Sequence, residues 1–300
     1  MQVFKPFQKL FPAKNTEGNT RTDNSSLISE SYEINTAALA PDPTPATINN
    51  GGGVGSQCLE PKVIVREEKA GVRVFLMDRD REILRVCYEQ QFLLKEHIET
   101  FFRGCSQRRI NFRIQQLIAG GFIRRESYPD LRCQTLFRLT KTGCRLARQY
   151  NARAAGYLAR LSPSTLFHDA LVTSCRLRIA DFWDAEFLPE RALKELEVPE
   201  VPDGVWRFKS GKMIALEVEC SDKGRRRFLS RLQSFGHIDA ITFVLYVTPN
   251  ERMHGIVKSY IKDGPQEQPV GVVLWDLLKS DQSPVWTQRG EVDVFSKREW

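Results

Sequence analysis

The sequence predicts a mixed α/β (α+β) protein with two folded domains. The first observation is its length of 300 residues, which suits about two domains of ordinary size. The second is an early run of three helix patterns, a hairpin pattern and a further helix. The third is the rest of the chain, where strand and helix patterns alternate as in a sheet covered by helices. We therefore expect a disordered tail over residues 1–70, domains over 77–160 and 163–280, and a C-terminal tail over 281–300.

Composition restricts the setting in which the chain works. The formal charge is +7 and the isoelectric point is about 9.1, which favours an anionic partner, either nucleic acid or a lipid surface. The apolar runs at 241–247 and 270–275 are too short to cross a membrane, and residues 1–11 lack a secretory pattern, so we expect no membrane insertion. None of the seven cysteines forms a C-x-x-C pair, which fits a reduced, cytoplasmic setting and argues against a structural zinc site.

The N-terminal segment divides into two parts. Residues 15–57 are rich in Asn, Thr, Ser, Pro and Gly and have few large apolar side chains, so we expect them to be disordered. Residues 1–11 place Phe4, Phe7 and Phe11 at near-helical spacing beside lysines. Two interpretations stay open for them, a frayed amphipathic tail and a short docking motif for a partner protein.

The first folded region has the element order of a winged helix-turn-helix domain. Ser106 and Thr140 are placed to cap helices, and Gly120 and Gly121 end one of them. Tyr128–Pro129–Asp130 belongs to a turn-rich hairpin. The helices are expected at 78–90, 95–102, 107–119 and 141–158, an extended piece at 92–94, and the strands at 122–126 and 135–139.

Basic residues are concentrated in this region. Between Arg103 and Ala154 the chain has twelve basic residues against two acidic ones, a balance of +10. Eleven of the twelve are arginine, whose planar fork suits phosphates and guanine edges. We expect the region to bind double-stranded DNA. The alternative is a winged helix used for protein contacts, with the arginines as solvated surface.

The third helix is the expected recognition helix. Ile110, Ile114 and Leu117 share one face, and Gln107, Arg108 and Asn111 lie away from it. Recognition helices read base edges from their N-terminal residues, and the hairpin strands and turn form the wing. The expected DNA-binding residues are Gln107, Arg108, Arg109, Asn111, Arg113, Arg124, Arg125 and Arg132, the last three on the wing.

The second folded region is expected to be a mixed sheet with helices. A hairpin turning at 209–212 joins two of its strands, and a basic helix follows that hairpin. The expected helices are 163–180, 223–235 and 251–261, and the expected strands are 185–188, 204–208, 213–220, 241–247 and 271–275.

Three carboxylates mark a candidate metal site in this region. Asp203 precedes one strand of the hairpin, and Glu217 and Glu219 lie two residues apart on the next, so the glutamates project from one face. Carboxylates in a dry sheet are costly unless a cation pairs with them. Mg²⁺ or Mn²⁺ is the expected cofactor, because a metal held in this way polarises a phosphodiester and activates water.

The arrangement resembles the restriction-endonuclease-like superfamily. Pro202–Asp203 and Glu217 match its pattern of Pro-Asp followed by an acidic residue on the next strand, whereas Glu219 stands at its lysine position. The resemblance implies a metal at Asp203, Glu217 and Glu219 and a stabilising cation from Lys223. His168 and Glu190 are the remaining candidate catalytic residues. The simpler interpretations are a cap or hydrogen bond for His168, a solvated helix-start acid for Glu190 and a turn residue for Asp203.

The two regions together resemble the replication-relaxation family of plasmids and mobile elements. The resemblance rests on FRLTKTGCRLA at 137–147, FHDALVTSCRLRI at 167–179 and WDAEFLPERAL at 183–193, followed by the carboxylate hairpin. It implies a DNA-binding protein at a replication or transfer origin, with metal-dependent nicking as in relaxases of that class. Tyr150 and Tyr157 lack an H-x-H cluster nearby, which argues against a tyrosine relaxase.

Three functions therefore stay open. The first is a relaxase-like endonuclease, and the second is a catalytically inactive, sequence-specific replication or transcription regulator. The third is an assembly factor that recruits transfer or replication proteins through residues 1–11. The sequence leaves open whether a homodimer binds the DNA, because no heptad pattern is present.

Overall fold

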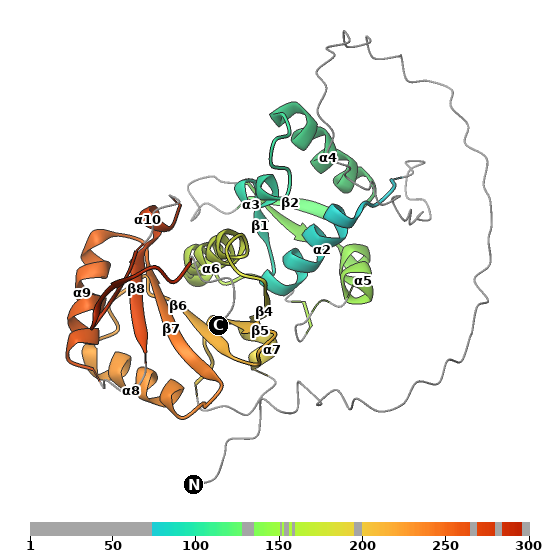
Figure 1. Cartoon of the computed structure of the whole chain (residues 1–300). Helices are drawn as coiled ribbons and strands as arrows, with labels where there is room; N and C mark the ends of the chain where they lie inside the picture. Colours follow the sequence, from blue (N-terminus) through green and yellow to red (C-terminus); the bar gives the residue numbers. More distant parts are fainter. Residues whose placement is uncertain are drawn as a thin grey trace, which may run out of the picture. The chain divides into compact units, whose positions relative to one another are not determined.

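The computed structural model describes residues 74–127, 135–150, 152, 156–157, 160–194, 200–264, 269–279 and 284–295 (Figure 1). All of them belong to one compact unit. They form a mixed α/β structure with a small three-stranded antiparallel sheet and a seven-stranded mixed sheet. The expected disordered tail and Arg132 lie outside the described residues.

The small sheet belongs to the N-terminal part of the described chain. Its strand order is β1-β3-β2, and both pairings are antiparallel. The elements are α2 (Asp78–Gln90), β1 (Leu93–Leu94), α3 (Lys95–Thr100), α4 (Gln107–Ala119), β2 (Ile123–Ser127), β3 (Thr135–Leu139) and α5 (Lys141–Gln149).

Both predicted helix caps of this part are confirmed. The Ser106 hydroxyl accepts a hydrogen bond from the Arg109 N–H, and the Thr140 hydroxyl accepts one from the Gly143 N–H. The prediction that the last helix continues to residue 158 is wrong, because α5 ends at Gln149. Beyond it the Tyr157 hydroxyl donates to the Gln91 carbonyl at 2.7 Å and accepts from the Leu139 N–H at 2.8 Å.

The apolar faces of these helices meet over the small sheet. Ile83, Ile98, Ile110 and Phe137 are buried in one cluster. Gly143 allows α5 to approach the hairpin closely, because a Cβ there would lie 2.1 Å from the Phe122 carbonyl oxygen.

The seven-stranded sheet has the order β10-β9-β8-β7-β6-β5-β4. Strands β4, β5 and β6 form an antiparallel meander, β7 and β8 are parallel to β6, and β9 and β10 pair antiparallel. Its strands are β4 (Ala185–Pro189), β5 (Gly204–Phe208), β6 (Met213–Val218), β7 (Ile241–Thr248), β8 (Val270–Leu274), β9 (Val285–Thr287) and β10 (Gly290–Val292). The helical segments are η2 (Pro163–Thr165), α6 (Leu166–Ile179), α7 (Glu190–Leu193), α8 (Arg225–Gly236), α9 (Glu251–Lys262) and α10 (Trp275–Lys279).

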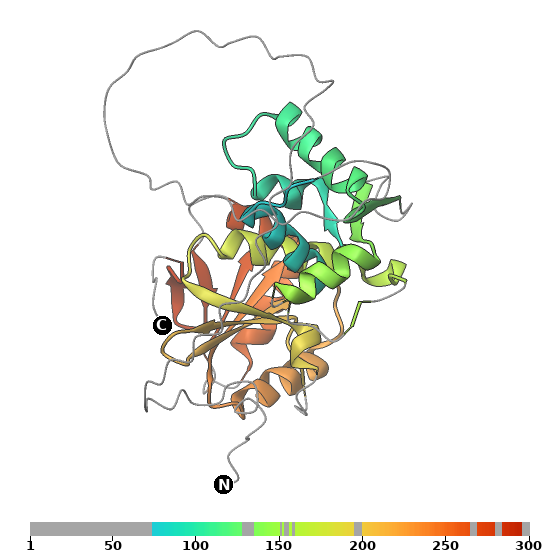
Figure 2. The ribbon, with the colours of Figure 1, turned by 90° about the vertical axis from the view of Figure 1, so that its right-hand side faces the viewer.

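Helices cover both faces of this sheet (Figures 1 and 2). On one face α6 packs over alternate residues of β6 and β7, among them Leu216 and Leu245. On the other face Phe228 of α8 contacts Tyr246 of β7, with ring centroids 4.7 Å apart. Strands β9 and β10 lie within the stretch expected as a C-terminal tail. No helix of the described ranges is long and apolar enough to span a membrane.

Candidate functional site: an acidic cluster at strand ends and a basic helix face

Asp203 is bound to the start of α6 and to the neighbouring strand. Its Oδ2 lies 3.1 Å from His168 Nε2 and accepts a hydrogen bond from the Val218 N–H at 2.7 Å. The other ring nitrogen of His168 lies 3.2 Å from Asp169 Oδ1. Burial alone would lower the pKa of His168, but the two carboxylates raise it to about 10. His168 is therefore an imidazolium at neutral pH and serves as the cationic partner of Asp203.

Glu217 lies on the adjacent strand, and Arg231 of α8 is its partner. Its side chain is 2% exposed, and Oε2 lies 2.9 Å from Nη1 of Arg231, whose Nη2 donates to the Val201 carbonyl. The other oxygen, Oε1, has no hydrogen-bond partner among the described residues. Burial, and then the charge of Asp203, raise the pKa of Glu217 well above its usual range. The Glu217 carboxyl group is thus buried with one oxygen, Oε1, that accepts no hydrogen bond among the described residues.

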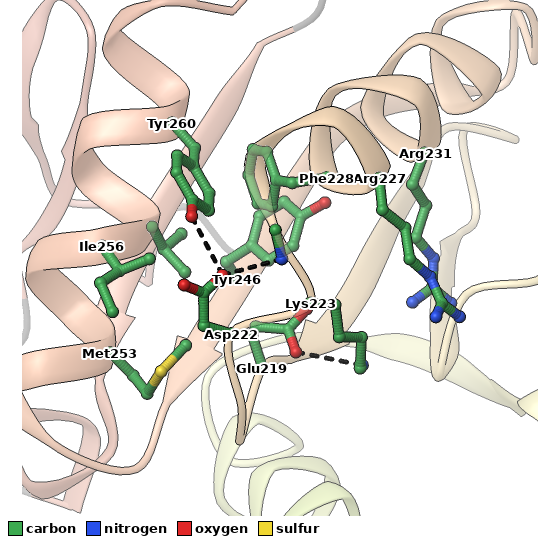
Figure 3. A pocket seen from close by; sticks show the side chains of 12 residues that line it. Glu219, Asp222, Lys223, Arg227, Phe228, Arg231, Tyr246, Met253, Ile256 and Tyr260 are labelled. Carbon is green, nitrogen blue, oxygen red and sulfur yellow. Dashed lines mark hydrogen bonds and ion pairs between the residues drawn. The ribbon is translucent and has the colours of Figure 1, made fainter.

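A third pair lies where β6 leads toward α8. Glu219 Oε1 is 3.0 Å from Lys223 Nζ, and both residues line a small pocket together with Arg231 and Tyr246 (Figure 3). Tyr246 is the register partner of Glu217 across β6 and β7. It is 1% exposed, and its hydroxyl has no hydrogen-bond partner among the described residues. Burial, then Glu217, raise its pKa, so the phenol stays neutral.

Sequence reasoning missed Arg231 and Tyr246. Arg231 follows Arg227 by one helical turn in the basic helix, so the spacing was a usable signal. Tyr246 lies in an apolar strand and gave no signal, because its pairing with Glu217 depends on the register of two strands far apart in sequence.

Two pockets contain most of the candidate site residues, and Glu217 lines neither of them. His168, Glu190 and Asp203 line a pocket of about 540 Å³, whereas Glu219 and Lys223 line the smaller one. The Glu190 carboxylate is 2.7 Å from Lys194, and its backbone N–H donates to the Asp203 carbonyl at 3.3 Å. Its side chain thus pairs within its own short helix.

The three expected metal ligands do not form a metal site as they are placed. Asp203, Glu217 and Glu219 each have a cationic partner of their own, on different elements. In the described part of the chain, no three His, Cys, Asp or Glu side chains form a group that could hold a metal ion. The positive charge that the carboxylates require is supplied by His168, Arg231 and Lys223.

The His168–Asp203 pair makes stability depend on pH in a specific direction. The folded-state pKa of His168, about 10, lies above its ordinary value of 6.5. Its contribution is therefore complete below pH 6.5 and is lost as the pH rises through about 10. We expect His168→Gln to lower the free energy of unfolding by about 1–3 kcal/mol at pH 7. Chemical denaturation of both proteins between pH 6 and pH 10 measures the difference, which should shrink as the pH rises.

The matched control is the exposed His237, whose change to Gln should leave stability unchanged at every pH. A difference between wild type and His168→Gln that stays constant up to pH 10 would contradict the ion pair.

The predicted recognition helix has an exposed polar face. Arg108, Arg109 and Asn111 are exposed on the first turns of α4, behind the Ser106 cap. Gln107 is exposed too, and its amide donates to Glu99 at 3.0 Å. Arg113 is different, because its guanidinium binds Asp80 and is only 15% exposed.

The arginines of the hairpin differ in their exposure and in their partners. Arg124 pairs with Glu126 at 2.7 Å, and Arg125 is exposed above the Phe137 ring. Arg138, counted among the basic residues of this region, is buried. Among residues 103–154, the exposed cations that have no acidic partner in the described part of the chain are Arg108, Arg109, Arg125, Lys141, Arg145 and Arg148, and the last of these donates a hydrogen bond to the Tyr88 hydroxyl.

The fold and these two surfaces define a mixed α/β protein with a basic helix face and an acidic cluster at its strand ends. Comparison with models of protein families, with curated proteins and with solved structures finds no match to this chain. The resemblance to the replication-relaxation family stays a prediction from the quoted motifs.

Proposed function

We propose that the chain is a sequence-specific DNA-binding protein that acts at a replication or transfer origin of a plasmid or mobile element. The observation that carries the proposal is the exposed face of α4, where Arg108, Arg109 and Asn111 follow a capped helix start. A helix of this size fits the major groove of duplex DNA, and its N-terminal residues reach base edges there. The order of α2 through α5 supports a winged helix-turn-helix domain.

The remaining exposed cations extend this face. Arg125 belongs to the hairpin that would be the wing, and Lys141 and Arg145 belong to α5. Phosphate contacts by such side chains position a protein on the duplex without reading its sequence. Base reading is then assigned to Arg108 and Asn111 of α4, and phosphate binding to Arg109, the hairpin and α5.

We assign the seven-stranded region to a restriction-endonuclease-like domain that serves as a scaffold in a regulator. Strands β5 and β6 form a hairpin, β7 is parallel to β6, and the charges of Asp203 and Glu217 interact, which supports this assignment. Each carboxylate is neutralised by a basic side chain of this chain. This favours a protein that binds DNA over one that also cuts it.

A metal-dependent, relaxase-like endonuclease is the second candidate. Glu217 Oε1 and the Tyr246 hydroxyl, which are among the buried groups without hydrogen-bond partners in the described residues, favour it because they lie on register partners of the cluster. Buried polar groups are almost always satisfied, so an unpaired acceptor and donor on register partners indicate a place for a ligand. Mg²⁺ or Mn²⁺ at Glu217 would require Arg231 to withdraw from it.

Binding to duplex DNA at two or more salt concentrations tests the proposed function. Phosphate contacts by Arg109, Arg125, Lys141 and Arg145 give an expected slope of log K against log salt of about −3.6, at roughly 0.9 per phosphate contact. Footprinting on origin DNA should show a discrete protected site. A flat salt dependence would contradict the proposal.

Incubation of supercoiled origin plasmid with Mg²⁺ or Mn²⁺ separates the two candidates. We expect no open circles from wild type, and unchanged DNA binding by Asp203→Asn and Glu217→Gln, because the acidic cluster is then only structural. Nicking by wild type that both variants lose would establish the endonuclease instead. Asp276→Asn is the matched control, because this exposed acid pairs with Lys279 on α10 and lines neither pocket of the cluster.

A further inference from the structure

Phe112 is an exposed aromatic side chain in the middle of α4. It is 62% exposed, whereas Ile110, Ile114 and Leu117 of the same helix are buried. At 3.6 residues per turn Phe112 falls almost opposite the centre of that buried face. It therefore occupies the centre of the exposed face. The residues expected from the sequence to contact DNA did not include it.

The neighbours of Phe112 indicate what it meets, since a single exposed apolar residue is common on protein surfaces. Arg108 precedes it by four residues, Arg109 precedes it by three, and Gln115 follows it by three, so all three flank it on the helix surface. All three are exposed. The face thus consists of one apolar group within a ring of cations and amides. The cations of this face complement a polyanion, and Phe112 complements an apolar group on that polyanion.

We propose that Phe112 contacts the C5-methyl group of a thymine in the major groove and is a specificity-determining residue of this chain. The inference rests on the proposed DNA-binding function. The thymine methyl is the apolar group that the base edges of the major groove present, and guanine and adenine edges beside it suit the arginine and amide side chains. Phe112 therefore selects thymine at one position of the site, while Arg108 and Gln115 contact neighbouring base pairs.

The probe is a DNA duplex that the full chain selects from a pool of random-sequence duplexes. Wild type and Phe112→Ala are each used for selection, and wild type should enrich a motif with a thymine position that Phe112→Ala does not require. The selected duplex is then compared with one in which deoxyuridine replaces that thymine, which removes only the methyl group. Burial of one such group contributes about 0.8 kcal/mol, so wild type should bind the uracil duplex about fourfold more weakly.

Phe112→Ala should bind the two duplexes equally, and it should fold normally because the side chain is exposed. Arg109→Ala is the matched control, because loss of this cation should weaken binding to both duplexes by the same factor and preserve their ratio. Equal binding of both duplexes by wild type, or the same ratio in Phe112→Ala, would overturn the thymine contact and leave a protein partner as the occupant of this face. Enrichment of no sequence by wild type, with a flat salt dependence, would instead reject the DNA-binding function.

Discussion

Arg176→Met is expected to lower the free energy of unfolding by about 3–5 kcal/mol, because it leaves a carboxylate buried without its charge partner. Arg176 of α6 binds Glu89 of α2, and the two side chains are only 4% and 0% exposed. Arg85 also reaches Glu89, at 3.1 Å, but it is shared with Glu82. Urea denaturation followed by circular dichroism measures the loss.

The double variant Glu89→Met/Arg176→Met is the control for this ion pair. Replacement of both partners by apolar groups removes the unpaired charge, so its stability should return to within about 1–2 kcal/mol of wild type. Lys194→Met breaks an exposed pair and should cost about 0.5 kcal/mol or less. An Arg176→Met loss as small as that of Lys194→Met would contradict the buried pair. A confirmed loss would show that α2 and α6 are held together by charge as well as by apolar packing.

Arg108→Ala/Arg109→Ala is expected to have the largest effect on DNA binding. Both side chains are exposed at the start of α4 and have no acidic partner among the described residues. One base contact and one phosphate contact are lost, so affinity for the selected site should fall by about 10- to 100-fold. The salt slope should decrease in magnitude by about 0.9, because one phosphate contact is lost. Titration of a labelled duplex at several salt concentrations measures both quantities.

The matched control for that variant is Arg252→Ala/Lys262→Ala. These two residues are exposed on α9 and change the net charge by the same amount. Their loss should leave the salt slope unchanged and alter affinity by less than about twofold, because distant charges are screened within about 10 Å at 0.1 M salt. Equal effects of the two double variants would show that net charge, and not the α4 face, controls binding.

Local sequence signals were sufficient for most of the secondary structure. The bounds of α2 and β3 agree with the predicted residues, and Ser106 and Thr140 cap the helices that they were expected to cap. Such features depend on side chains within a few positions of one another, so they can be read from a single sequence. The error at α5 concerns a stretch with non-local contacts, since the Tyr157 hydroxyl beyond the helix binds the Gln91 carbonyl, 66 residues earlier in the chain.

The sequence by itself determined which residue types are available: a basic region with one predicted recognition helix, and three acids near a hairpin. Only the tertiary structure decided how each of them is used. Arg113 and Arg108 are alike in sequence, but Arg113 is bound to Asp80, 33 residues earlier, and Arg108 is exposed. Likewise the three acids do not converge on one another. Each pairs with a different cation, namely His168, Arg231 or Lys223. The physical reason is that burial and charge pairing depend on segments far apart in the chain, which spacing along the sequence does not report.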